Sequence, residues 1–181
     1  MLGILGKGLK KIFGTKSDKD LKLLYPYVDK INLEFDKLSS ISDQELRDKT
    51  VSFKEKISSN TKEVSGQIKS LKEDYINEKE QNIELKEEIL DKIDKLSIEE
   101  KKIIENTLNE ILPEAFAVVK ETARRFSVNK EIKVKAEDFD YNLASIKDNV
   151  KIEGKNAIWI NKWNAAGVEI EWNMIHYDVQ L

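Results

Sequence analysis

The sequence contains no cysteine, one histidine and two prolines among its 181 residues. Without cysteine the chain has neither a disulfide framework nor a thiolate metal site, and His176 alone cannot assemble a metal site of another kind. No apolar run approaches the roughly 20 residues that cross a bilayer. The net charge of −3, from 31 basic and 34 acidic residues, excludes a globally basic nucleic-acid binder. We therefore expect neither a metal nor a nucleic acid partner.

Charged residues make up 36% of the chain and hydrophobic residues 40%. So much charge is typical of long solvated helices and leaves only a modest core. The length suggests one domain, or one domain with an extension. We predict an α+β fold that is mainly helical, with an amphipathic amino-terminal helix, a long charged helical pair and a small antiparallel β part near the carboxyl terminus.

Residues 1–16 carry lysines as their only charged side chains. Apolar residues recur there at helical spacing, which places them on one face and the lysines opposite. Such a basic amphipathic helix can lie in a membrane interface. Two alternatives stay open: a helix that docks on the rest of the chain, and a cleaved secretory signal. The residues expected to contact the membrane are Lys7, Lys10, Lys11, Leu5, Leu9 and Phe13.

Residues 17–110 show helical periodicity with glutamate and lysine at most other positions. Ser42 and Glu45 have the spacing of a capping box that opens a helix. A second box at residues 97–100 predicts that one helix ends near Leu96 and another begins, which gives an antiparallel pair. Pro113 favours the first turn of a further helix. We assign the charged pair no chemistry, since a solvated prop is its simpler interpretation.

From Lys130 the hydrophobic period changes to that of strands. Residues 150–160 read as a hairpin around a Gly/Asn turn, and residues 168–172 give another alternating run. All three tryptophans, Trp159, Trp163 and Trp172, fall in this region. They could form a ligand platform, but apolar filler of a small sheet is the simpler interpretation.

The final stretch, from Met174 to Leu181, contains Tyr177, Asp178 and Gln180 after a strand-like run. A glutamine amide offers a donor and an acceptor side by side. This pair is complementary to the N7 acceptor and N6 donor of adenine. An aromatic ring three residues upstream could stack on the base, although this pattern alone is also ordinary surface.

Three segments in this order resemble the amino-terminal region of SecA, the ATP-driven motor of bacterial protein export. They are Met1 to Lys56, Glu114 to Arg125 and the last eight residues, whose ending is similar to that family's Q motif. The stretches between look like insertions. The expected segments are a basic helix (1–16), a helical segment (17–57), a helical-pair insertion (58–110), a family-like helix (111–128), a β-rich insertion (129–173) and the Q-motif-like end (174–181).

The resemblance implies that Gln180 reads adenine, that Tyr177 takes the place of a stacking Phe, and that Met174 lies against the nucleotide. Ile175 departs from the basic residue common at its position, so no charge contact there is carried over. The parent would contain RecA-like lobes, of which this chain would begin one. It would use ATP with Mg²⁺ and couple hydrolysis to export.

The resemblance also implies partners: a SecYEG-type translocon, anionic phospholipids, preproteins and a second copy of the chain in a homodimer. The parent would lie on the cytoplasmic side of the inner membrane. The 181 residues contain no Gly-x-x-x-x-Gly-Lys-Ser/Thr phosphate loop. We therefore expect an amino-terminal fragment that has no catalytic residue, binds no cofactor alone and is inactive as an ATPase. The alternative is a stand-alone membrane-associated or adaptor module without ATPase activity.

Overall fold

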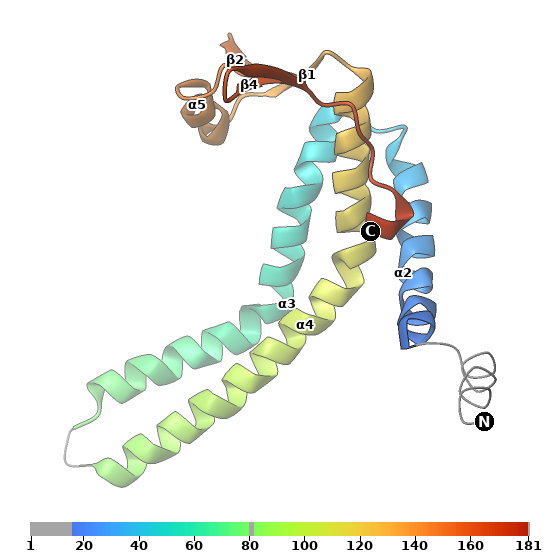
Figure 1. The fold of residues 1–181 in the computed structure, drawn as a ribbon. Coiled ribbons are helices and arrows are strands. Elements are labelled where there is room, and N and C mark those ends of the chain that lie inside the picture. Colours follow the sequence, from blue (N-terminus) through green and yellow to red (C-terminus); the bar gives the residue numbers. More distant parts are fainter. Residues whose placement is uncertain (1–15, 80–81, 181) are drawn as a thin grey trace, which may run out of the picture. The chain divides into compact units, whose positions relative to one another are not determined.

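The fold was taken from a computed structural model, which describes residues 16–79 and 82–180. The predicted basic helix therefore lies almost wholly outside the described residues, as does Leu181. The described chain is mainly helical and has a small antiparallel β part, which confirms the predicted fold class (Figure 1). The helices are α2 (Lys16–Leu38), α3 (Asp43–Asn77), α4 (Ile83–Val128) and α5 (Asp138–Ala144). The strands are β1 (Glu131–Lys135), β2 (Val150–Glu153), β3 (Asn156–Ile160), β4 (Lys162–Ala165) and β5 (Val168–Glu171), and the 3₁₀ helix η1 covers Asp178–Gln180.

The chain divides into two compact units. One unit comprises residues 1–46 and 116–181, and the other comprises residues 47–115. The boundaries fall inside α3 and α4, so each long helix contributes to both units. The predicted insertion 58–110 falls within the second unit. None of the described helices has the length and apolar character needed to cross a membrane.

In the second unit, α3 and α4 run antiparallel (Figure 1). Apolar residues at helical spacing, Val64 and Ile68 on α3 and Ile89 and Ile111 on α4, are buried. Polar contacts join the two helices as well: the Asn60 amide donates to the Thr107 hydroxyl at 3.0 Å. The ion pairs Lys49–Glu114 (2.8 Å) and Lys56–Glu110 (3.0 Å) and the Ser65–Glu100 hydrogen bond link the same helices. The helical pair predicted from the periodicity is thus present.

The predicted position of the helix break is wrong. No helix ends near Leu96, because α3 ends at Asn77 and α4 continues from Ile83 to Val128. The Glu100 carboxylate accepts a hydrogen bond from Ser65 of α3 and therefore serves the helix pairing. A Ser-x-x-Glu spacing in the sequence is compatible with a helix interior when the glutamate has such a partner.

Pro113 also does not begin a helix, since it lies inside α4. A proline in a helix interior removes one backbone hydrogen bond and costs about 3 kcal/mol. The helix nevertheless continues because buried residues lie on both sides of the proline, with Ile111 before it and Ala117 and Val118 after it. Their packing offsets the local penalty.

The capping box at the start of α3 is confirmed. The Ser42 backbone N–H donates to Glu45 Oε2 at 2.7 Å, and the Glu45 N–H donates to Ser42 Oγ at 3.2 Å. These hydrogen bonds from the Ser42 backbone and side chain lower the pKa of Glu45. The start of α3, and with it the loop that follows α2, is therefore fixed by local chemistry.

The β part consists of a three-stranded antiparallel sheet, in the order β1-β3-β2, and a separate β4–β5 hairpin. Ile132 pairs with Trp159 and Ile152 with Ala157, which places apolar residues on one face. These side chains form a small core with Val134, and Phe126 at the end of α4 packs against it. The predicted hairpin turn is confirmed, with Gly154 at φ +61°. Ala166 and Gly167, both at positive φ, turn the second hairpin.

Candidate functional site

The three residues predicted to bind adenine lie in the segment that follows β5. This segment has no regular structure until η1, a single turn of 3₁₀ helix. The Gln180 backbone N–H donates to the Tyr177 carbonyl at 2.8 Å, and the Tyr177 N–H donates to Gln180 Oε1 at 2.8 Å. The Gln180 side chain thus folds back onto its own turn. We call residues 177–180 the glutamine turn.

The chemistry available at this turn fits a purine base. No described residue accepts a hydrogen bond from Gln180 Nε2, so this donor is available to an acceptor such as adenine N7. The oxygen Oε1 keeps one lone pair beside the Tyr177 N–H, enough to accept from an exocyclic amine. Tyr177 is 75% exposed, which leaves ring surface for stacking. Met174 is also exposed, three residues before this ring.

Trp172 anchors the beginning of this segment on α4. Its indole Nε1–H donates to the Ala123 carbonyl at 3.1 Å and to the Met174 carbonyl at 2.9 Å. The Trp172 ring also lies against Trp163, with ring centroids 6.5 Å apart. The tryptophan therefore fixes the chain path immediately before Met174, which supports the interpretation of these rings as packing residues.

A second anchor lies at the glutamine turn itself. Asp178 Oδ1 accepts hydrogen bonds from Asn32 Nδ2 of α2 at 3.2 Å and from Lys120 Nζ of α4 at 3.4 Å. Lys120 Nζ also donates to Asn32 Oδ1 at 2.7 Å and lies 5.0 Å from the centroid of the Phe35 ring. The turn is thus held by both helices through one carboxylate. Lys120 and Ala123 are one helical turn apart, so the two anchors share one side of α4.

A buried charge cluster supports this part of α4. Glu121 is fully buried and accepts hydrogen bonds from Arg124 (2.7 Å, two bonds) and from Arg125 Nε (2.8 Å). Arg125 also donates to Asp43 Oδ1 (2.6 Å) and to the carbonyls of Leu38 (3.0 Å) and Ile41 (2.7 Å). The arginine fork therefore fastens the loop between α2 and α3 to α4. We call Glu121, Arg124, Arg125 and Asp43 the arginine cluster.

The electrostatics of the arginine cluster follow from its burial. Burial raises the pKa of Glu121, but the hydrogen bonds and positive charge of Arg124 and Arg125 together outweigh this, so the pKa lies below its usual value. The hydrogen bond to Glu121 in turn raises the pKa of Arg124. Glu121 therefore stays ionised, with its charge compensated by the two guanidinium groups.

Sequence analysis did not identify Asn32, Lys120 or Glu121 as contributors to this region. The spacing of Glu121 and Arg125, four residues apart on a helix, was a usable signal for an ion pair. The partners of Asp178 lie 58 and 146 residues away in sequence, and no local pattern indicates them.

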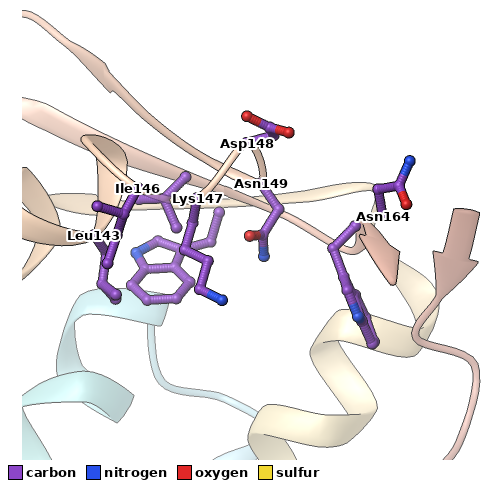
Figure 2. A pocket seen from close by; sticks show the side chains of 9 residues that line it. Leu143, Ile146, Lys147, Asp148, Asn149 and Asn164 are labelled. Carbon is purple, nitrogen blue, oxygen red and sulfur yellow. The ribbon is translucent and has the colours of Figure 1, made fainter. Parts of the chain in front are cut away.

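A separate pocket of about 420 Å³ lies beside the three-stranded sheet. Figure 2 shows Ile146 and Lys147 on one side of this pocket and Asn164 on the other. Trp159 also lines it; its Nε1–H donates to Asp140 at 3.0 Å and its ring stacks on Phe139. Met174, Tyr177 and Gln180 are not among the lining residues, so this pocket is distinct from the predicted adenine site.

The described residues contain no cluster of three or more histidine, aspartate or glutamate side chains that could hold a metal ion. The six residues predicted to contact a membrane, from Leu5 to Phe13, lie outside the described residues. Of the residues predicted to form a site, the structure therefore describes Met174, Tyr177 and Gln180.

Comparison with known proteins identifies the family of this chain. The sequence matches the SecA DEAD-like domain family over residues 9–181. It is 46% identical to the protein translocase subunit SecA of Bacteroides fragilis over 175 residues, which cover 96% of this chain and 15% of that protein. The corresponding protein of Cytophaga hutchinsonii is 45% identical over 181 residues (100% and 16%).

The SecA subunit of Flavobacterium psychrophilum is 47% identical over 173 residues, covering 96% of this chain and 15% of that protein. The chain thus spans about one sixth of the length of these relatives. No solved structure matches it. The matched region includes both stretches between the three recognised segments, the helical pair and the β part. The chain belongs to the SecA DEAD-like domain family.

Proposed function

We propose that these 181 residues act as the amino-terminal part of a SecA-type preprotein translocase, which couples ATP binding and hydrolysis to protein export through a SecYEG-type channel. The observation that carries this proposal is the glutamine turn in a chain of this family. It presents an amide donor that no described residue binds and an exposed tyrosine, and Trp172 and Asp178 hold it on α4. Preproteins and anionic phospholipids are the further partners proposed.

In this proposal Gln180 hydrogen-bonds the adenine edge, Tyr177 stacks on the base, and Met174 lies against the nucleotide. The triphosphate and its Mg²⁺ carry most of the anchoring charge, and the chain contains no phosphate loop to receive them. Hydrolysis therefore requires residues outside this sequence. The isolated 181-residue chain is proposed to bind ATP negligibly and to hydrolyse none.

Residues 1–14 are proposed to supply membrane contact, with Lys7, Lys10 and Lys11 facing anionic headgroups and Leu5, Leu9 and Phe13 entering the interface. Each lysine near an anionic surface contributes about 1 kcal/mol. In this proposal the contact holds the protein at the cytoplasmic face of the inner membrane. It also makes the attachment reversible and sensitive to salt.

The test uses the full-length protein that carries this sequence. Gln180→Ala should lower the preference for ATP over GTP by roughly 10-fold, the loss expected when a bidentate base contact worth about 1–3 kcal/mol is removed. Val179→Ala is the matched control, because this neighbouring side chain is highly exposed and makes no predicted base contact. Tyr177→Phe should bind ATP like the wild type, and Tyr177→Ala should bind it more weakly.

An unchanged ATP-to-GTP preference in Gln180→Ala would refute the adenine-reading role. Purified 181-residue chain that hydrolyses ATP above a buffer control would refute the proposed inactivity. If the 181-residue chain hydrolyses no ATP and the full-length protein exports no preprotein, the alternative of an adaptor module without ATPase activity is favoured.

A further inference from the structure

The glutamine turn has little burial of its own. None of the residues of η1 is buried, and Val179 and Tyr177 are among the most exposed apolar side chains of the described chain. Apolar packing therefore cannot fix this turn. Its internal hydrogen bonds, between Tyr177 and Gln180, close the turn on itself and leave its position on the helices undetermined.

The position is instead set by a triangle of three polar side chains. Asn32 uses both ends of its amide, accepting from Lys120 and donating to Asp178. The Lys120 side chain is only 11% exposed, and a cation with so little access to water needs partners. Asn32, the Phe35 ring and the Asp178 carboxylate supply them. Two of the three partners that hold Lys120 beside Asp178, Asn32 and Phe35, therefore come from α2.

We propose that Asn32 and Lys120 are positioning residues for nucleotide selection: through Asp178 they hold the glutamine turn so that Tyr177 and Gln180 are arranged before a base arrives. Asp178 lies between these two residues, so fixing its carboxylate restricts both. This inference rests on the proposed adenine-reading role of Gln180. It adds a requirement that α2, by way of Asn32, supports the selectivity of the turn.

The first experiment measures ATP and GTP affinity in the full-length protein carrying Asp178→Ala. Asp178 is 64% exposed, so its truncation removes the shared acceptor without opening a core. Apparent affinity falls with the fraction of molecules in the binding-competent arrangement. We expect ATP binding to weaken by roughly 3- to 20-fold and GTP binding to weaken less, because the Gln180 contact is the one specific for adenine. Asn32→Ala should give the same pattern, and Lys120→Arg should restore most of what Lys120→Ala loses.

The matched control is Lys162→Ala. Lys162 is a surface lysine that pairs with Glu169 and Glu171, each at 3.3 Å, within the β4–β5 hairpin. The Lys162→Ala substitution removes comparable ion pairs that do not involve the glutamine turn. Its ATP-to-GTP ratio should equal that of the wild type. A ratio that falls as much as in Asp178→Ala would show a general effect of lost ion pairs and would overturn the proposal.

The second readout needs no nucleotide. Hydrogen exchange of a peptide covering residues 173–180 should be at least about threefold faster in Asp178→Ala, because the turn is no longer held on the helices. Exchange within α3 should not change. If the exchange of residues 173–180 and the nucleotide ratio both match the wild type, Asn32 and Lys120 do not position the turn.

The double variant Gln180→Ala/Asp178→Ala separates this inference from the function on which it rests. If Asp178 acts through Gln180, its truncation adds no further loss of ATP-over-GTP selectivity in the Gln180→Ala background. Additive losses would overturn the positioning role. If Gln180→Ala itself leaves selectivity unchanged, the adenine-reading function fails. If Gln180→Ala lowers selectivity and Asp178→Ala does not, only the positioning role fails.

Discussion

Replacing Arg125 with leucine should sharply destabilise the unit that contains the glutamine turn. Arg125 is 5% exposed, and its guanidinium serves Glu121, Asp43 and two backbone carbonyls. Leucine supplies none of these donors, so the fully buried Glu121 keeps only Arg124 as a charged partner. Removing one partner from a buried ion pair costs about 3–5 kcal/mol. That is a large fraction of the roughly 5–15 kcal/mol that keeps a domain folded.

Urea unfolding followed by tryptophan fluorescence measures this loss. All three tryptophans lie in the unit formed by residues 1–46 and 116–181, so the signal reports on that unit. At a slope near 2 kcal/mol per molar urea, the midpoint of Arg125→Leu should fall by roughly 1.5–2.5 M. Arg124→Leu is the comparison, because Arg124 is one-third exposed and its side chain pairs with Glu121 among the described residues. It should lose less than Arg125→Leu, because Arg125 still compensates Glu121 and keeps its bonds to Asp43 and the two carbonyls.

The mechanism predicts a partial rescue. Glu121→Gln in the Arg125→Leu background removes the buried charge that the first substitution leaves undercompensated. The double variant should therefore be more stable than Arg125→Leu alone. A midpoint for Arg125→Leu within about 0.3 M of the wild type would refute the reasoning, since it would show that less than ~1 kcal/mol depends on the arginine fork.

Three further predictions concern other parts of the chain. The folded-state pKa of Glu121 is lowered from 4.5. Its stabilising contribution should therefore be complete well above pH 4.5 and be lost as the pH falls through the lowered pKa. Urea midpoints at pH 7 and pH 4 should differ less in Glu121→Gln than in the wild type. Replacing residues 58–110 with a short Gly/Ser loop should leave the tryptophan emission maximum unchanged, whereas a large red shift would show that the helical pair belongs to the core. The full chain should float with anionic but not with zwitterionic vesicles in low salt. Deletion of residues 1–14, or conversion of Lys7, Lys10 and Lys11 to Glu, should abolish flotation. A deletion variant that floats equally well would contradict the membrane role.

The features that could be predicted from the sequence are those decided by neighbouring residues. The Ser42–Glu45 capping box closes within four residues, and both of its hydrogen bonds form as expected. The hairpin at Gly154 follows from strand alternation on either side of a turn residue, and its φ of +61° is one that glycine adopts without strain. In both cases, contacts and backbone preferences within a few residues decide which local structure forms.

The helix boundaries expected near Leu96 and at Pro113 are wrong because continuation of α4 depends on partners far away in sequence. A Ser-x-x-Glu pattern at residue 97 has the same local chemistry as the one at residue 42. The two patterns differ because Ser65 on the facing helix donates a hydrogen bond to Glu100, which is therefore not used in a capping box. Pro113 likewise favours a helix start locally, but the burial of Ile111 and Ala117 keeps one helix continuous. Local propensity is a weak prior that packing overrides.

The residues proposed to face the base were suggested by the sequence, whereas the residues that support the turn were not. Glutamine and tyrosine carry a recognisable chemistry in any context. Asn32 and Lys120 have no such signature, since an asparagine and a lysine on charged helices are ordinary surface residues. Their role depends on α2 and α4 meeting the carboxyl-terminal segment, and only the fold brings them to Asp178.

The course of the chain explains how a β part can interrupt this region without disturbing the glutamine turn. The chain leaves α4 at Val128, forms the sheet, and returns to α4 at Ala123 through Trp172. Asn161 closes the base of this excursion: its N–H donates to the Lys130 carbonyl at 3.0 Å, and its carbonyl accepts from the Trp172 N–H at 2.8 Å. The entry and exit of the β part are therefore tied together by one buried residue. Since both anchors of the turn lie on α4, its position depends on that helix and on α2 and not on the strands of the β part.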